Sequence, residues 1–278
     1  MAADTRTVNA FVASRDGTRI AYRAWPHSQA SITLAVAHGL GEHAGRYADF
    51  AESMGRRGMG VFAMDLRGHG LSQGQRGHLD SWSQWTDDIS AFLAEVAKQV
   101  EGEVVPLGHS FGGAAMLSAV LEGKVGPARR FIVSSPALRA KVAIPQWKMT
   151  LGNVSSSLLP RLSMSNEVDA HTVSRIPEVV TAYQSDPLVH SKISSRMFTE
   201  WTKATQNVLD HVGEIQLPFL ILAGTADQLI DPAGSEELHR RSAAKSELHL
   251  LPGRYHEPFN DLGRDEVFDL IADWLRAK

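Results

Sequence analysis

VVPLGHSFGG, the sequence of residues 104–113, decides the fold of this 278-residue chain. The apolar residues 104–107 predict a short buried strand, and residues 112–121 predict a helix. Between them lies Gly108-His109-Ser110-Phe111-Gly112, a G-x-S-x-G pattern in the strand–turn–helix setting of a nucleophile elbow. Glycines let the backbone pass closely through a sharp turn, which lifts the Ser110 hydroxyl above the sheet. We therefore expect Ser110 to be a catalytic nucleophile.

Strands and helices alternate on both sides of this stretch, which predicts a mostly parallel sheet covered by helices on both faces. Asp16-Gly17 separates two strand-like segments and predicts that the sheet opens with an antiparallel hairpin. Strands are expected at residues 7–14, 18–25, 32–38, 60–64, 131–134, 218–222 and 247–251. Further helices are expected at residues 47–57, 82–100, 197–209 and 265–276. The fold class is therefore α/β.

The alternation breaks between about Ala137 and Val212, where four prolines and several apolar segments occur. Insertions this long inside a compact domain are usually functional lids or caps. We expect residues 137–196 to form a small helical cap, and residues 1–136 and 197–278 to form the core.

A serine nucleophile needs a base, and the base needs an acid that orients it. With an elbow of this kind, the acid and then the histidine follow the serine along the chain. Asp227 follows the strand at residues 218–222, and His256 follows the last strand. Asp231 is a competing acid, but it directly precedes Pro232, which favours a helix cap. We predict a triad of Ser110, Asp227 and His256.

The segment His38-Gly39-Leu40-Gly41 follows the strand at residues 32–38, where a second oxyanion donor is expected. The backbone N–H groups of Leu40 and Phe111 are therefore the predicted oxyanion hole. The predicted reaction is acyl transfer through a covalent intermediate on Ser110.

Composition narrows the remaining classes. The net charge is −3 and charged residues make up 21% of the chain, so nothing indicates a nucleic-acid partner. The chain has no cysteine, which excludes disulfides and metal sites with thiolate ligands. His38 and His43 could form a metal pair, but the sequence offers no third ligand of suitable type and spacing nearby. We expect no metal and no cofactor. No signal peptide or membrane span is visible, so we expect a cytoplasmic protein, with contact to a lipid surface left open.

Five blocks of the sequence carry a family resemblance. Residues 38–47, HGLGEHAGRY, resemble the H-G-x-G-E-H…G-R-Y signature of monoacylglycerol lipases. Residues 65–72, DLRGHGLS, resemble the family's D-x-R-G-H-G-x-S block, and Ser185-Asp186-Pro187-Leu188 resembles its cap-exit motif. Gly224-Thr225-Ala226-Asp227 and Tyr255-His256 are similar to the segments that carry the acid and the base. The blocks span nearly the whole chain, and the bacterial monoacylglycerol lipase and lysophospholipase-like branch is the nearest match.

The resemblance implies an α/β-hydrolase fold with a small helical cap and a substrate with one esterified acyl chain, classically a monoacylglycerol. By the same analogy, Glu42, Arg46, His109 and Tyr183 line a polar pocket for glycerol. A structural alternative is that Glu42 and Arg67 form an ion pair that joins two loops. The apolar cap residues are expected to form an acyl tunnel and a lid that touches micelles or membranes; they are Leu151, Val154, Leu158, Leu159, Leu162 and Met164.

Two alternatives stay open. A broader carboxylesterase, a lysophospholipase or a peptidase could use the same triad, because fold and triad do not set the leaving group. A ligand-binding member of the fold without turnover is the remote alternative. A haloalkane dehalogenase is excluded because its nucleophile is an aspartate, whereas this chain has Ser110. The oligomeric state does not follow from the sequence.

Overall fold

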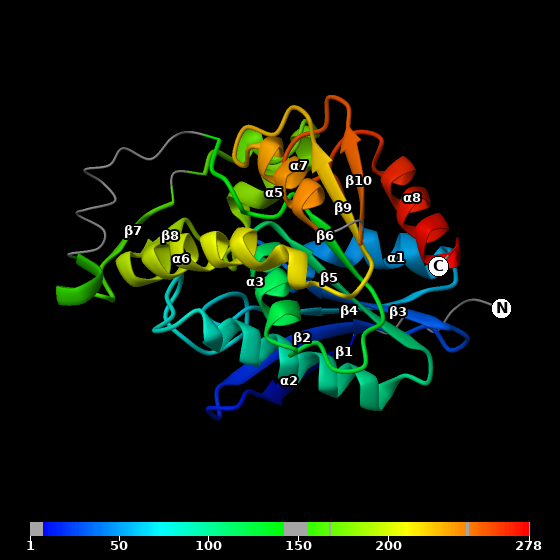
Figure 1. The fold of residues 1–278 in the computed structure, drawn as a ribbon, viewed down its shortest axis with the longest axis horizontal. Helices are drawn as coiled ribbons and strands as arrows, with labels where there is room; N and C mark the ends of the chain where they lie inside the picture. The colour runs from blue at the N-terminus through cyan, green and yellow to red at the C-terminus, as the bar shows by residue number, and fades with distance from the viewer. Residues whose placement is uncertain (1–7, 142–154, 167, 243–244, 278) are drawn as a thin grey trace.

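An eight-stranded sheet runs through the part of the chain that the structure describes (Figure 1). The computed structural model describes residues 8–141, 155–166, 168–242 and 245–277. The strand order is β1-β2-β4-β3-β5-β6-β9-β10. The strands are β1 (Val8–Ala13), β2 (Arg19–Trp25), β3 (Ile32–Ala37), β4 (Gly60–Met64), β5 (Glu103–His109), β6 (Phe131–Ser134), β9 (Phe219–Gly224) and β10 (Ser246–Leu251).

The pairing of these strands confirms the predicted fold class. β1 pairs antiparallel with β2, and β2 pairs antiparallel with β4, so the expected hairpin around Asp16-Gly17 opens the sheet. All later neighbours, from β4 to β10, pair in parallel. Parallel strands need crossover connections, and the helices supply them. Their carboxyl ends consequently meet at one edge of the sheet, where Leu40, Ser110 and Asp227 follow β3, β5 and β9.

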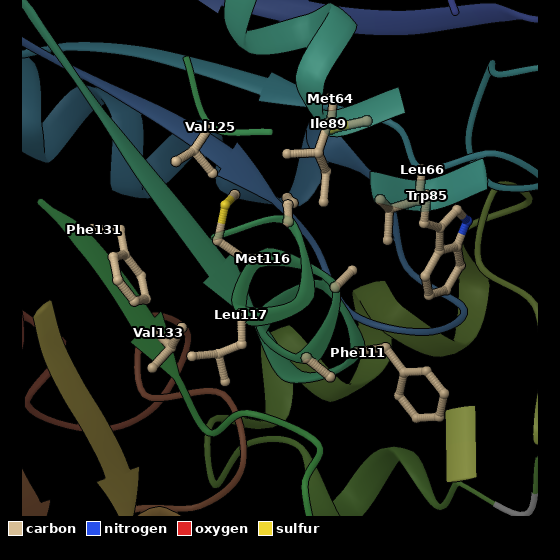
Figure 2. Close-up of a cluster of buried hydrophobic side chains, with 14 of the residues drawn as sticks. Met64, Leu66, Trp85, Ile89, Phe111, Met116, Leu117, Val125, Phe131 and Val133 are labelled. Atoms are coloured by element: carbon tan, nitrogen blue, oxygen red, sulfur yellow. The ribbon is translucent and has the colours of Figure 1, made fainter. Parts of the chain in front are cut away.

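Helices cover both faces of the sheet. The helices are η1 (Ala44–Tyr47), α1 (Ala48–Arg56), α2 (Ser83–Gln99), α3 (Ser110–Leu121), η2 (Ala170–Thr172), α5 (Pro177–Ser185), α6 (Ser195–His211), η3 (Val212–Glu214), α7 (Pro232–Arg241) and α8 (Arg264–Ala277). α1 and α8 pack together against one face, and α2, α3 and α6 pack against the other. Figure 2 shows part of the second core, with Met116 and Leu117 of α3 near Phe131 and Val133 of β6.

The central strand β3 shows why the sheet lies between two cores. Leu34 and Val36 point to the core made with α1 and α8, whereas Ala35 and Ala37 point to the core made with α2 and α3. Successive side chains of a strand alternate between faces, so a strand covered on both sides is apolar throughout. This explains why residues 32–37 read as a continuous apolar run.

Between β6 and β9 the chain leaves the sheet. Residues 155–158 are helical, and α5 and α6 follow. The segment also contains β7 (Ser163–Ser165) and β8 (Lys192–Ser194), which pair antiparallel in a second, two-stranded sheet. The sequence analysis missed this sheet because three-residue strands are too short to show alternation. Leu151 and Val154, two of the predicted cap residues, lie outside the described residues.

The helix after the predicted insertion is two residues longer at each end than expected. We expected a helix at residues 197–209, and α6 extends from Ser195 to His211 because Ser194 caps it by accepting a hydrogen bond from the N–H of Met197. α7 was not predicted as a full helix, although its cap was. The side chain of Asp231 accepts a hydrogen bond from the N–H of Ala233, and Pro232 occupies the first turn, as expected.

Close backbone contacts surround the turn between β5 and α3. A Cβ added at Gly112 would overlap the carbonyl oxygens of Ala37 and His38, at the end of β3. A Cβ at Gly108 would collide with the backbone of Gly112 and Gly113. Glycine is therefore required at both positions for space, even though neither has a positive φ.

We predict that Gly112→Ala lowers the free energy of unfolding by about 1–3 kcal/mol, because backbone atoms must move to admit the methyl group. The matched control is Gly55→Ala in α1, where an added Cβ meets nothing within 4 Å. That variant should be more stable than wild type by about 0.5–1 kcal/mol, because alanine is the better helix former. Urea unfolding followed by circular dichroism measures both. Equal stability of Gly112→Ala and wild type would contradict the packing argument.

Candidate active site

Ser110 lies at the first residue of α3, directly after β5 ends at His109. Its φ is 52°, a left-handed conformation that is rare for residues other than glycine. Such a conformation costs on the order of 1–3 kcal/mol and persists only where the surrounding structure imposes it. The strain and the N-terminal position on α3 are the features expected of a nucleophile elbow.

His256 links Ser110 to Asp227. The Nε2 atom of His256 lies 2.9 Å from Ser110 Oγ, and its Nδ1 atom lies 2.7 Å from Asp227 Oδ2. All three residues are at most 6% exposed. The structure therefore brings together the three residues that the sequence analysis proposed as a triad, in the order in which a proton can pass from serine to histidine.

Backbone groups hold the Asp227 carboxylate in place. Its Oδ1 atom accepts hydrogen bonds from the N–H groups of Leu229 at 2.8 Å and Ile230 at 3.0 Å, which leaves Oδ2 for His256. Asp231 instead caps α7, and its carboxylate lies 3.8 Å from the ammonium group of Lys141. The geometry separates the two candidate acids as the sequence analysis expected.

The electrostatics of the pair favour a charged imidazole. Burial alone would lower the pKa of His256, but the Asp227 carboxylate outweighs it and raises the pKa above its ordinary value. Burial raises the pKa of Asp227, whereas His256 and the two backbone donors lower it more, so the net pKa is depressed. An imidazolium formed when Ser110 loses its proton would thus be stabilised by a carboxylate that stays ionised.

The loop after β3 passes close to Ser110. A Cβ added at Gly39 would lie 3.0 Å from Ser110 Cβ, which is tighter than most Cβ contacts, so the loop packs closely against the nucleophile. The N–H of Gly39 donates to Glu42 Oε1 at 2.7 Å, which fixes the loop. In the described residues the Leu40 N–H has no hydrogen-bond acceptor, and both Leu40 and Phe111 line the pocket above Ser110.

A buried charge cluster lies beside His256. Arg46 donates from both terminal nitrogens to Glu257, at 2.7 Å each, and from one of them to Glu42 at 2.8 Å. The guanidinium also lies 4.7 Å from the centre of the Tyr183 ring. Glu42 and Arg46 pair with each other, whereas Arg67 pairs with Asp16 and Asp88. The alternative ion pair between Glu42 and Arg67 is therefore wrong.

The sequence analysis missed Glu257. This residue follows His256 directly and is 5% exposed, and its carboxylate also accepts from Asn260 Nδ2 at 3.0 Å. Burial raises its pKa, but Arg46 outweighs burial and depresses the pKa to about 2, so Glu257 is ionised. The signal available in the sequence was its position next to the predicted base, which by itself does not reveal a partner 211 residues away.

His109 completes the polar side of the site. Its ring centre lies 5.0 Å from that of His256, and its Nδ1 lies 3.1 Å from the carbonyl oxygen of Ser134. Burial, together with the neighbouring His256, lowers the pKa of His109 to about 3, so this side chain is neutral. The predicted polar residues Glu42, His109 and Tyr183 all line one pocket, and Arg46 lies behind them.

The pocket has a volume of about 750 Å³, within the roughly 300–1,000 Å³ range of small-molecule sites. Ser110 and His256 lie in its wall. Glu42 and Glu257 contribute charged groups to its lining, and Ser155, Ser165 and Asn166 contribute further polar groups. The other lining residues are mostly apolar; they are Leu40, Phe111, Ala140, Leu162, Met164, Val168, Val173, Ile193, Phe198, Trp201, Leu229 and Ile230. Among the described residues, no group of three or more His, Asp or Glu side chains is arranged to hold a metal ion.

Comparisons with known proteins show the family of the chain. The sequence model of the family described as "Serine aminopeptidase, S33" matches residues 28–263. A "Monoacylglycerol lipase" from Mycolicibacterium smegmatis is 34% identical over 281 residues, covering 99% of each chain. The crystal structure of Paleococcus ferrophilus monoacylglycerol lipase superposes with a TM-score of 0.79 at 33% identity, covering 87% of this chain and 93% of that one. An uncharacterized abhydrolase domain-containing protein of Dictyostelium discoideum is 31% identical over 266 residues, and the chain spans 28% of its length.

We predict that hydrolysis of a short p-nitrophenyl ester rises with pH through a midpoint above 6.5, because His256 must be neutral to accept a proton and its pKa is raised. Asp227→Asn removes the carboxylate that raises this pKa and leaves the burial that lowers it. The midpoint of kcat/KM should therefore shift to lower pH, and the maximal rate should fall by roughly 10⁴-fold.

The matched control for this experiment is Asp231→Asn, which alters a carboxylate four residues away that caps α7. It should keep the wild-type midpoint. A pH profile that moves with Asp231→Asn and not with Asp227→Asn would assign the acid to Asp231.

Proposed function

The chain belongs to the serine aminopeptidase S33 family of α/β-hydrolases and is a hydrolase with esterase chemistry, and from this premise we propose that it cleaves monoacylglycerols to glycerol and a free fatty acid. The observation that carries the proposal is the hydrogen-bonded series Ser110–His256–Asp227 in the wall of a pocket that is apolar on one side and polar on the other. Relatives named as monoacylglycerol lipases support the choice of substrate.

In the proposed mechanism, Ser110 Oγ attacks the ester carbonyl while His256 Nε2 takes its proton. Asp227 keeps the imidazole in the orientation set by the 2.7 Å hydrogen bond and stabilises the imidazolium. His256 then protonates the departing glycerol oxygen, which leaves the acyl group on Ser110. A water molecule deprotonated by His256 releases the fatty acid and restores the serine.

The N–H groups of Leu40 and Phe111 are the proposed donors to the oxyanion. Phe111 lies in the first turn of α3, where backbone N–H groups have no acceptor within the helix. Gly39 packs closely against Ser110, and the next residue, Leu40, lines the same pocket as Ser110. One such donor typically contributes about 3–4 kcal/mol of transition-state stabilisation. These are backbone groups, so their contribution depends on the position of the loop and not on the Leu40 side chain.

The two ends of the substrate match the two ends of the pocket. The polar end offers carboxylate, phenol and imidazole groups of Glu42, Tyr183 and His109, which can exchange hydrogen bonds with glycerol hydroxyls. The apolar end, with residues such as Phe198 and Trp201, accommodates an acyl chain. A single-chain ester fills both ends.

Exposed apolar side chains lie beside the pocket mouth. Leu158, Leu159, Leu162 and Met164 are 75%, 59%, 47% and 49% exposed, and Leu162 and Met164 also line the pocket. A contiguous exposed apolar patch marks a site of interaction with a protein or a membrane. No helix in the described residues is long and apolar enough to cross a membrane. We propose that this patch of the cap, predicted at residues 137–196, docks on lipid surfaces that hold the substrate.

We predict that Ser110→Ala lowers kcat/KM for 1-oleoylglycerol by about 10⁴-fold or more, because the nucleophile is lost while the fold remains. Ser235→Ala is the matched control, since Ser235 is also buried and its hydroxyl has no hydrogen-bond partner among the residues that the structure describes. The panel adds dioleoylglycerol, p-nitrophenyl butyrate and an aminoacyl p-nitroanilide. Wild type should prefer 1-oleoylglycerol. Preferred cleavage of the anilide would make the protein a peptidase and contradict the proposal.

The double variant Leu158→Ser and Leu159→Ser should bind neutral lipid vesicles at least about tenfold more weakly, because two leucines that enter the lipid are lost. Hydrolysis of the water-soluble p-nitrophenyl butyrate should stay at the wild-type rate. Leu250→Ser, which alters a leucine that is 38% exposed on β10, is the control for general surface hydrophobicity. Vesicle sedimentation measures the partitioning, and unchanged binding by the double variant would argue against docking at this patch.

A further inference from the structure

The polar end of the pocket presents carboxylates without an accessible cation. Glu42 and Glu257 both line it, next to His256, and their side chains are 5% and 6% exposed. No arginine or lysine lines the pocket in the part of the chain that the structure describes. A negatively charged ligand at this end would therefore meet negative charge directly.

Arg46 cannot supply the missing cation. Both of its terminal nitrogens donate to Glu257, one of them also donates to Glu42, and its flat face lies against the Tyr183 ring. The Arg46 side chain is 9% exposed and lies behind the two carboxylates. A bidentate arginine–carboxylate pair is among the strongest polar contacts in proteins, so a ligand would have to break it to reach the guanidinium.

The two carboxylates are held by other donors as well. Glu42 Oε1 accepts from the N–H of Gly39 and from the Tyr47 hydroxyl at 3.1 Å, and Glu257 Oε2 accepts from Asn260. These contacts fix the carboxylates in place and leave them no freedom to swing away from an anion.

The charges of the cluster add up to no more than zero. Arg46 contributes one positive charge and Glu257 one negative charge, and Glu42 contributes a second negative charge when ionised. Burial, opposed by Arg46 and reinforced by Glu257, raises the pKa of Glu42, but its protonation only brings the cluster to neutrality. His109 is neutral, and a positive charge on His256 is balanced by Asp227.

We propose that Glu42 and Glu257 make this pocket select an uncharged alcohol as the leaving group and exclude the same alcohol when it carries phosphate. The proposal rests on the proposed function and names the substrate class of the same site. Moving a phosphate out of water requires a compensating cation, and this end of the pocket presents two carboxylates and, within the described residues, no arginine or lysine. The pocket volume of about 750 Å³ is large enough for the phosphate-bearing lipid. We therefore attribute the exclusion of this lipid to charge and not to size.

The test compares 1-oleoylglycerol with 1-oleoylglycerol 3-phosphate, which share the acyl chain, the ester and the glycerol. Both are presented in the same uncharged detergent micelles, and oleate release is measured. The wild-type kcat/KM for the uncharged lipid should exceed that for the phosphate by at least about tenfold, because the phosphate loses its hydration beside two carboxylates and gains no cation in return.

Glu257→Gln tests the role of the carboxylate, because glutamine has the same shape and its amide oxygen can still accept from Arg46. The ratio of kcat/KM for 1-oleoylglycerol to kcat/KM for 1-oleoylglycerol 3-phosphate should fall by about tenfold. Most of this change should come from faster hydrolysis of the phosphate-bearing lipid. Glu42→Gln is the second variant, in case Glu257→Gln does not fold. Glu52→Gln is the matched control, since it also removes one negative charge from an ion pair, but on the exposed surface of α1; it should keep the wild-type ratio.

Equal rates on the two lipids in the wild type would overturn the proposal. The proposal would also be overturned if Glu257→Gln and Glu42→Gln both kept the wild-type ratio of kcat/KM for the uncharged lipid to kcat/KM for the phosphate. An enzyme that hydrolyses p-nitrophenyl butyrate but neither oleoyl lipid would refute the proposed function itself, which is a distinct result. Narrowing of the ratio in Glu257→Gln and not in Glu52→Gln supports the assignment.

Discussion

The strained turn at Ser110 is the constraint on which the site depends. A serine with a φ of 52° sits where the backbone of Gly112 is pressed against the carbonyl oxygens that end β3. The same contact joins the start of α3 to the end of β3, and β3 leads directly into the loop that carries Leu40. Consequently one piece of backbone packing sets the position of the nucleophile and of the loop beside it. Neither could move without opening the centre of the sheet.

The residues at strand ends could be predicted from the sequence because chain order and parallel pairing place them. Ser110, Asp227 and His256 follow the carboxyl ends of β5, β9 and β10, and these parallel strands lie in one sheet in the order β5-β6-β9-β10, so the three residues share one edge of it. The apolar runs of β3, β4 and β5 are equally informative, since strands buried on both faces carry a continuous signal. Asp231 was separable from Asp227 for a local reason, its position before Pro232.

The features that could not be predicted depend on contacts between distant segments. Arg46 and Glu257 form an ion pair although they are 211 positions apart in the sequence, and no local sequence pattern predicts this contact. The same holds for Arg67, whose partners Asp16 and Asp88 lie in the hairpin turn and in α2. The two-stranded sheet of β7 and β8 was not predicted for another reason. Strands of three residues are too short to show the alternation of apolar and polar side chains that identifies a strand. Glu257 was visible beside the base, but its role comes from burial and its partner.

The charge cluster is hard to explain by stability. Burying two carboxylates with one guanidinium carries a desolvation penalty, and apolar residues of similar volume are often at least as stable. The triad has its own acid in Asp227, and within the described residues neither Glu42 nor Glu257 forms a hydrogen bond with it, although both carboxylates help to raise the pKa of His256. The position of the cluster in the pocket gives a further reason for it. It faces the polar end of the pocket, where the leaving alcohol must lie when the acyl chain occupies the apolar end. The negative charge of Glu42 and Glu257 therefore influences which alcohol the enzyme accepts as a leaving group. The cleavage of the ester bond itself depends on the turn that positions Ser110.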